Sequence, residues 1–330
     1  MPAPFPEILA YGEPMIEYNQ VKGGSGRDFL QGFGGDTSNF IIAAARQGAK
    51  TGYISALGAD ANAAMFRRLW DEEGVDHSLV LENKAAPTGM YFVTHGPNGH
   101  EFTFARAGSA ASLYSPADVP RAAITKARAL HLSGISLAIS NSACDAAYGA
   151  IHAAREAGCL VSFDTNLRLK LWSKDRARAI MTDIIRLSDI VLPSYDDIVA
   201  ITDITEADAL VDWCLAKGAK IVALKLGSDG ALVADRNGRT RVPPHPCQPI
   251  DATGAGDCFG GAFIARLVGW LLQLSGKLTG IASSEGMFIA GRQTQKTDTA
   301  HWAGAHRLLT NRLAEAAVVQ TTARSILDEG

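Results

Sequence analysis

The chain has 330 residues, of which 47% are hydrophobic and 20% are charged, so it can bury a large core and differs from disordered and collagen-like sequences. Its formal net charge of −3, without a basic run, gives no electrostatic support to binding of nucleic acid or to attachment to a membrane surface. The sequence shows no signal peptide, no apolar run long enough to span a bilayer, and no zinc-type spacing of its five cysteines. We therefore expect a cytoplasmic protein with reduced thiols.

Short apolar runs alternate with amphipathic stretches along the chain, which is the pattern of a mostly parallel sheet covered by helices. Strands are expected over residues 7–11, 52–57, 129–133, 160–164, 190–192 and 221–226. Helices are expected over residues 36–47, 60–73, 142–157, 175–187 and 206–217. No linker divides the chain, so the sequence predicts one α/β domain over residues 1–330.

Two segments interrupt this alternation. Residues 18–33 are rich in glycine and polar side chains, and the expected strands 88–94 and 101–106 flank a Gly-Pro-Asn-Gly turn. A hairpin inserted between βα units normally leaves the main sheet. We expect a small β lid formed by about residues 12–33 and 87–108.

A glycine-rich segment, Asp251-Ala252-Thr253-Gly254-Ala255-Gly256-Asp257, precedes an apolar stretch that predicts a helix. Gly254 and Gly256 permit a close approach of the backbone, and free amides at a helix N-terminus stabilise an anion. Asp257 in the first turn is either a partner of the helix dipole or a base beside a transferring phosphoryl group.

A second glycine loop, Lys225-Leu226-Gly227-Ser228-Asp229-Gly230, follows a buried strand. The carboxyl end of a strand is where α/β folds bind ligands, although such a loop can also be a plain β-turn. Neither glycine segment is a Walker A loop or a Rossmann fingerprint.

Polar side chains follow another buried strand, at Asp164, Asn166 and Arg168. In an extended chain these three point to the same side, which favours a binding site over a solvated loop. Arg106 lies at the base of the expected lid and has the two-pronged donor that suits a carboxylate. Gly34-Gly35-Asp36 precedes a helix, where Asp36 is either a cap or a contact for a hydroxyl group.

Together these residues resemble the ribokinase-like carbohydrate kinases of the PfkB family. The family's two signatures are matched by residues 34–39 and 251–257, and the similarity runs from about residue 8 to 267. Within the family, the chain is most similar to the members that phosphorylate 2-keto-3-deoxygluconate. The stretches that carry this similarity are residues 12–17, 33–37, 132–139, 163–168 and 192–197.

The resemblance implies a role for each matching position. Asp257 would deprotonate the terminal hydroxyl of the sugar, while the amides of Gly254, Ala255 and Gly256 would form the anion hole. The substrate would contact Gly34, Asp36, Tyr91, Phe104, Arg106, Ile135, Arg168 and Asp257. ATP would be bordered by Asn166, Arg168, Lys225, Gly227, Ser228, Gly230, Gly254 and Gly256.

The resemblance further implies Mg²⁺, held through water by Asp197, and in some relatives a monovalent cation. Ser194 stands where the family's metal motif has Asn. Residues 269–310 lack the Ala- and Asn-rich helix that borders the adenine in relatives. The family's lid strands often pair between subunits, so a homo-oligomer, either a dimer or larger, is expected.

The expected function is ATP-dependent phosphorylation of 2-keto-3-deoxygluconate at its terminal hydroxyl, giving the 6-phosphate. The alternatives are a fructokinase, ribokinase or nucleoside kinase of the same family, and a non-catalytic protein that binds a sugar or nucleotide. Neutral sugars do not require paired arginines, and this feature distinguishes a kinase of a sugar acid from the fructokinase, ribokinase and nucleoside kinase alternatives.

Overall fold

The structure is a computed structural model that describes residues 5–96, 99–245, 252–274, 279–283, 286–289, 292–297, 299, 302–309 and 316–319. Asp251 of the first glycine-rich segment and Cys247 lie outside the described residues. Among those described, no helix combines the length and the apolarity needed to span a bilayer.

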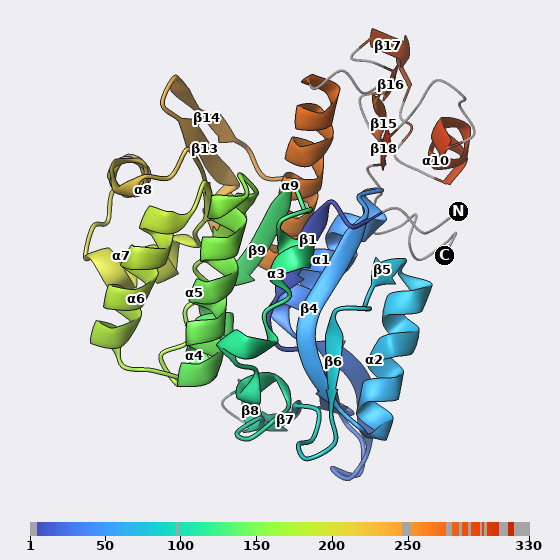
Figure 1. Ribbon diagram of the computed structural model, residues 1–330, viewed down its shortest axis with the longest axis vertical. Helices are drawn as coiled ribbons and strands as arrows, with labels where there is room; N and C mark the ends of the chain where they lie inside the picture. Colours follow the sequence, from blue (N-terminus) through green and yellow to red (C-terminus); the bar gives the residue numbers. More distant parts are fainter. Residues whose placement is uncertain are drawn as a thin grey trace.

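A large twisted sheet forms the centre of the molecule (Figure 1). Its order is β14-β13-β12-β11-β10-β9-β1-β4-β5, with β6 paired to β4. All pairs from β12 to β5 are parallel, and β13 and β14 join antiparallel at one edge. The strands are β1 (Ile8–Tyr11), β4 (Thr51–Gly58), β5 (Val75–Asp76), β6 (Val80–Asn83), β9 (Ala129–Ser133), β10 (Leu160–Asp164), β11 (Ile190–Leu192), β12 (Ile221–Lys225), β13 (Ala231–Asp235) and β14 (Gly238–Val242).

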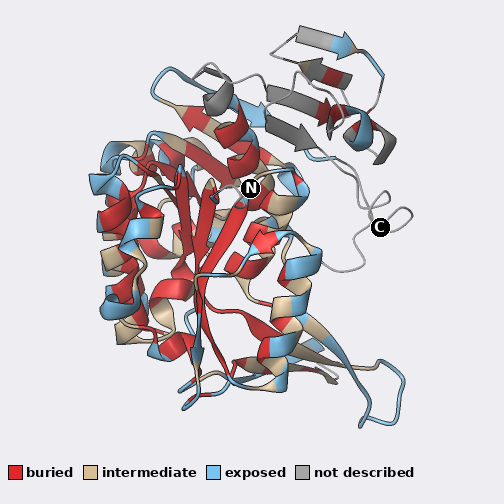
Figure 2. Cartoon of the chain, turned by 45° about the vertical axis from the view of Figure 1, so that its right-hand side comes forward, coloured by how far each residue is buried: buried red, intermediate tan, exposed pale blue. Residues whose placement is uncertain are grey.

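Helices cover both faces of this sheet, and its central strands are buried, whereas the edge strand β14 is exposed (Figure 2). In β1, Leu9 and Tyr11 pack against one helical layer, while Ile8 and Ala10 pack against the other. The first layer contains α3 (Arg121–Ile124), α4 (Gly134–Ala138), α5 (Asn141–Glu156), α6 (Lys174–Leu187), α7 (Tyr195–Thr202) and α8 (Ala207–Lys217). The second contains α1 (Asp36–Arg46), α2 (Ala61–Glu72) and α9 (Ala255–Leu274). The α/β fold expected from the apolar runs is confirmed.

The backbones of helices α1 and α9 approach each other very closely where the two helices cross. A Cβ atom placed on Gly261 of α9 would lie 2.3 Å from the Phe40 carbonyl oxygen and 2.9 Å from the Ala43 Cβ atom of α1. Only glycine therefore permits this crossing. The close contact brings the first turns of the two helices together, and both turns belong to the family signatures seen in the sequence.

A second, four-stranded sheet lies at one end of the main sheet (Figure 1). Its order is β3-β2-β7-β8, and its strands are β2 (Met15–Gln20), β3 (Phe29–Gly34), β7 (Met90–Gly96) and β8 (Gly99–Ala105). The expected hairpin corresponds to β7 and β8. The segment over residues 18–33 is less irregular than its glycines indicate, because β2 pairs with β7 on one side and β3 on the other.

The described part of the C-terminal segment forms a third sheet beyond the far end of α9 (Figure 1). Its strands are β15 (Thr279–Ser283), β16 (Gly286–Ile289), β17 (Arg292–Gln295) and β18 (Ala316–Val319), accompanied by α10 (Trp302–Leu309). Short strands thus occupy much of the region whose sequence departs from the family.

Candidate active site

The order in which strands are added to the sheet changes direction at β1. Strand β4 lies on one side of β1, and β9 and β10 lie on the other. This change of direction is the place where open α/β sheets bind ligands, beyond the carboxyl ends of the strands. Glu13 follows β1 there, Ile135 follows β9 and Asn166 follows β10. The first turns of α1 and α9 add Asp36 and Asp257.

Asp257 lies in the first turn of α9 and makes no ion pair among the described residues. Its Oδ2 atom accepts a hydrogen bond of 3.0 Å from the Asn39 side-chain amide of α1. Burial, followed by the negative charge of Asp36, raises the pKa of Asp257 to about 7, while the Asn39 bond and Lys225 act in the opposite direction. A carboxylate with a pKa near neutrality suits a general base.

The backbone beside Asp257 has the form of an anion site. Gly254 has a φ of +76°, and the Cys258 amide makes the first helical bond of α9, to the Gly254 carbonyl at 2.9 Å. The Ala255 amide donates to the Ala252 carbonyl at 3.1 Å, so the turn uses one of the three amides expected in the anion hole. The amides of Gly256 and Asp257 precede the first helical bond and are available to an anion.

One cation faces this helix end. Lys225, at the end of β12, donates to Asp164 Oδ2 at 2.5 Å, and both side chains are largely buried. A Cβ atom on Gly256 would lie 3.3 Å from Lys225 Nζ, so glycine leaves the ammonium beside the anion site. Burial raises the pKa of Asp164, whereas the Lys225 charge lowers it.

The loop after β10 turns more sharply than the expected extended chain. Asn166 has a φ of +30°, its amide donates to Asp164 Oδ1 at 3.2 Å, and its side chain donates to Asp36 Oδ2 at 2.9 Å. Arg168 is exposed and donates to the carbonyl of Leu167 at 2.8 Å. The alternation predicted for Asp164, Asn166 and Arg168 is therefore wrong, because a left-handed residue interrupts it.

Asp197, in the first turn of α7, supports this loop. Its Oδ2 atom accepts from the Leu167 amide at 3.0 Å and from the Thr165 hydroxyl at 3.2 Å. Burial raises its pKa, and the Leu167 amide lowers it. In the described part of the chain, no three His, Cys, Asp or Glu side chains gather as a metal site. The Asp197 carboxylate is an oxygen donor of the kind through which a water can hold a Mg²⁺ ion that is bound mainly by phosphates.

The sugar-binding residues expected from the sequence meet in part at the second sheet. A Cβ atom on Gly34 would lie 2.5 Å from the Tyr91 hydroxyl, so glycine makes room for this ring. Tyr91 donates to Glu17, and its ring lies 5.7 Å from that of Phe104. Ile135 lies in the first turn of α4, partly buried, beyond the end of β9.

Arg106 follows β8 and is already engaged within the protein. Its guanidinium donates to the carboxylate of Glu13, whose other oxygen accepts from the Ser109 hydroxyl at 2.6 Å. Sequence reasoning missed Glu13 and Asn39. A charged residue two positions after a buried strand, and an amide one helical turn after Asp36, were the available signals.

The second glycine loop borders the site at the end of β12. Gly227 and Ser228 belong to the 3₁₀ turn η3 (Gly227–Asp229) and are exposed. Gly230 has a φ of +86°, and a Cβ atom there would lie 2.1 Å from the Val242 carbonyl oxygen. The loop is therefore a tight turn into β13 with an open outer side.

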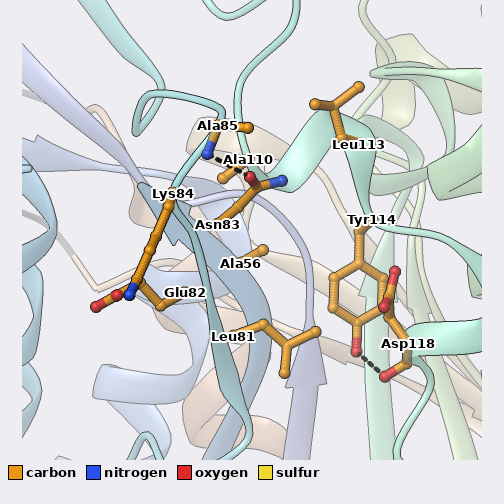
Figure 3. A pocket seen from close by; sticks show the side chains of 10 residues that line it. All are labelled: Ala56, Leu81, Glu82, Asn83, Lys84, Ala85, Ala110, Leu113, Tyr114 and Asp118. Atoms are coloured by element: carbon orange, nitrogen blue, oxygen red, sulfur yellow. Dashed lines mark hydrogen bonds between the residues drawn. The ribbon is translucent and has the colours of Figure 1, made fainter. Parts of the chain in front are cut away.

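A separate cleft of about 320 Å³ lies between β6 and the 3₁₀ turns η1 (Ala111–Leu113) and η2 (Pro116–Asp118) (Figure 3). Two of its polar side chains bond within the protein: Tyr114 donates to the Asp118 carbonyl at 2.7 Å, and Asn83 accepts from the Ala85 amide at 2.9 Å. The cleft is lined by Ala56, Leu81, Glu82, Asn83, Lys84, Ala85, Ala110, Leu113, Tyr114 and Asp118. None of these is a residue of the sheet-end site.

Comparison with known proteins identifies the family. The model of the pfkB family carbohydrate kinases matches residues 6–276. The chain therefore belongs to the pfkB family and is a carbohydrate kinase, as its two signatures predict. The match ends shortly after α9, where the sequence departs from its relatives.

Two curated relatives have nearly equal identity to this chain. Fructokinase-1 of Oryza sativa subsp. japonica is 33% identical over 268 residues, covering 79% of this chain and 83% of the relative. The 2-dehydro-3-deoxygluconokinase of Thermoproteus tenax is 32% identical over 266 residues, covering 78% and 81%. Overall identity thus does not separate a neutral from an acidic sugar.

Two solved structures show the same fold with ligands. A putative ribokinase II of E. coli in complex with ATP and Mg²⁺ has a TM-score of 0.73 and 26% identity, covering 80% of this chain and 86% of that one. A fructokinase double mutant of Vibrio cholerae O395, with fructose, ADP and potassium ion bound, has a TM-score of 0.71 and 26% identity, covering 80% and 85%.

Proposed function

We propose that the protein transfers the γ-phosphoryl group of ATP to the terminal hydroxyl of 2-keto-3-deoxygluconate, giving the 6-phosphate and ADP. The observation that carries this proposal is the placement of Asp257. Its carboxylate is held by Asn39 at the N-terminus of α9, beside free amides and the Lys225 ammonium. A base, an anion site and a cation together are what phosphoryl transfer to a hydroxyl requires.

In this reaction Asp257 accepts the proton of the terminal hydroxyl. The hydroxyl oxygen forms a bond to the γ-phosphorus, and the bond from that phosphorus to the oxygen bridging it to the β-phosphate breaks. The amides of Gly256 and Asp257 and the Lys225 ammonium stabilise the charge on the transferred group. Bound Mg²⁺ neutralises phosphate charge, and Asp197 would hold it through water.

The nucleotide is assigned to the side of the site formed by β10, β12 and α9. Asn166, Arg168 and Lys225 face its phosphates, and the open side of the η3 loop borders it. The relatives solved with ATP and Mg²⁺ and with potassium ion support this assignment of cofactors and a cation site. The short strands after α9 would take the place of the relatives' adenine-side helix.

Two arginines support a sugar acid, together with the local resemblance at residues 12–17, 33–37, 132–139, 163–168 and 192–197. Arg106 lies at the base of the second sheet, and Arg168 is exposed in the loop after β10. A guanidinium binds a carboxylate through paired hydrogen bonds. One observation favours the second candidate, a fructokinase: the Glu13 carboxylate already neutralises Arg106.

The second sheet is proposed to act as a lid within a single domain that works as a cytoplasmic homo-oligomer. Leu30, Phe102 and Phe104 are exposed on it, and Leu30 and Phe102 lie in one row through Asn19 and Val93. A second copy of the chain would cover the exposed apolar side chains Leu30 and Phe102. Closure of a lid over the sugar would exclude water and suppress hydrolysis of ATP.

Release of ADP across a panel of sugars tests the proposed function. The purified protein is incubated with ATP, Mg²⁺ and either 2-keto-3-deoxygluconate, gluconate, fructose, ribose or a nucleoside. We expect the highest kcat/KM with 2-keto-3-deoxygluconate. A preference for fructose would replace the sugar acid by the second candidate, and binding without ADP release from any member would contradict a kinase.

A further inference from the structure

A buried carboxylate lies where the lid sheet joins the main sheet. The Glu13 side chain is 0% exposed and follows β1, at the centre of the main sheet. Both of its oxygens accept hydrogen bonds, one from Arg106 and one from Ser109, and these two residues follow the last lid strand, β8. The pair therefore connects the middle of the main sheet to the base of the lid.

The surroundings of this carboxylate are shaped for it. A Cβ atom on Gly89, just before β7, would lie 2.8 Å from Glu13 Oε1. Burial raises the pKa of Glu13, and the Arg106 charge and the Ser109 hydroxyl lower it again. An unpaired carboxylate in this place would be costly, so Arg106 and Glu13 form a neutral unit.

Arg106 retains one donor without an acceptor. Its side chain is only 10% exposed, and its Nε atom is buried with no hydrogen-bond partner among the described residues. Buried donors are rarely left without a partner. That donor is covered by protein atoms, whereas the guanidinium carbon lies 5.7 Å from the ring centre of Phe104, so the charged end of Arg106 borders the aromatic side chains assigned to the sugar.

We propose that Glu13 is a positioning and specificity-determining residue: it fixes the guanidinium of Arg106 beside the sugar, and it neutralises the charge of Arg106. This inference rests on the proposed function. Arg106 then acts as a hydrogen-bond donor in a neutral pair, and a sugar carboxylate is attracted less strongly than by an isolated cation. Glu13 thereby limits the preference for an acidic over a neutral sugar.

The variant Glu13→Gln tests this directly. It keeps the shape and an oxygen that accepts from Arg106, but it removes the negative charge. The measured quantity is the ratio of kcat/KM for 2-keto-3-deoxygluconate to that for fructose. We expect this ratio to rise about 3- to 10-fold, through a lower KM for the acid, since charge-assisted hydrogen bonds are about twice as strong as neutral ones. The matched control, Ser109→Ala, removes the other hydrogen bond and leaves the ion pair, so the ratio is expected to stay unchanged.

A double variant, Glu13→Gln with Arg106→Gln, removes both charges at once. The proposal predicts weaker binding of both sugars. It also predicts that the ratio of kcat/KM for the acid to kcat/KM for fructose stays within about twofold of the wild type, because two neutral side chains replace an ion pair without net charge. A fall of the ratio by tenfold or more would show that Arg106 acts as a free cation and would overturn the proposal. An unchanged ratio in a folded Glu13→Gln protein would also overturn it.

Calorimetric binding of the two sugars to the same variants separates this inference from the proposed function. The acid-to-neutral ratio of dissociation constants is expected to change as the kinetic ratio does. If the wild type binds both sugars but releases no ADP, the kinase proposal fails while the role of Glu13 is still tested. If turnover is normal and the binding ratio does not respond to Glu13→Gln, the role of Glu13 fails alone.

Discussion

At the scale of single residues, the surroundings of Asp257 keep its carboxyl group protonated up to a higher pH than that of an exposed aspartate. Burial and the Asp36 charge raise its pKa to about 7. A general base works only when deprotonated, so activity is expected to rise with pH and to level off above about 7. The dependence of kcat/KM on pH measures this, and a profile that is flat between pH 5.5 and 8 would contradict it.

Among the neighbours of Asp257, the Asn39 amide lowers the pKa of this carboxylate the most. Because its hydrogen bond lowers the pKa of Asp257, Asn39→Ala is expected to raise that pKa and to shift the rising limb to higher pH. We also expect kcat to fall about tenfold as the carboxylate loses its orientation. Asn237→Ala, in the turn between β13 and β14, is the control and should leave the profile unchanged. If Asn39→Ala has the same dependence of kcat/KM on pH as the wild type, Asn39 does not set the pKa of Asp257.

At the scale of elements, the crossing of α1 and α9 positions the base. Gly261→Ala would place a methyl group 2.3 Å from the Phe40 carbonyl oxygen, so the helices must separate. We expect a loss of about 1–3 kcal/mol in the free energy of unfolding, together with reduced kcat. Thermal and urea unfolding measure the former.

The matched control for this variant is Gly149→Ala in α5. A Cβ atom there has its nearest neighbour at 3.8 Å, an ordinary contact, and alanine is favoured over glycine within a helix. We expect this variant to be as stable as the wild type or more so. Equal destabilisation of the two variants would show that the helix crossing is not tight.

The central strands could be predicted because each is buried on both faces and therefore appears as a continuous apolar run. Residues 129–133, 160–164 and 190–192 have the same bounds in the sequence analysis and in β9, β10 and β11. Strands β2 and β3 were less visible, since their pairing in the second sheet determines their conformation more than their own pattern does.

The site could be predicted where a motif carries it, and less well where tertiary contacts do. Asp257, Gly254 and Lys225 lie together as the glycine-rich segments indicate. The pairing of Glu13 with Arg106 joins residues 93 positions apart, and no local spacing reveals it. The turn at Asn166 likewise depends on its bond to Asp36, 130 positions away.

At the scale of the whole molecule, the exposed apolar side chains of the second sheet bear on assembly. Leu30 is 67% exposed in β3, on the face shared with Phe102. We expect the wild type to be a dimer or larger by light scattering, and Leu30→Glu to shift it toward the monomer, since a charge in an apolar interface is costly. Leu113→Glu, another exposed leucine in η1, is the control and should leave the mass unchanged. A monomeric wild type would contradict this assignment.

The C-terminal segment lies beyond the part of the chain that matches the family. The family match stops at residue 276, and strands β15 to β18 with α10 follow. No motif in residues 269–310 predicted this third sheet, because its strands are short and their pairing connects distant residues such as those of β15 and β18. The α9 helix, which carries Asp257, ends at Leu274, before the first strand of the third sheet.

The most direct test of the account is the turnover of Asp257→Asn. Asparagine has the same shape and an oxygen that accepts from Asn39, but it cannot take a proton from the sugar hydroxyl. With saturating ATP and sugar acid, we predict that kcat falls by roughly 10²–10⁴-fold while the KM for the sugar changes little. Turnover within a fewfold of the wild type, from a correctly folded variant, would contradict Asp257 as the base and with it the mechanism proposed for this site.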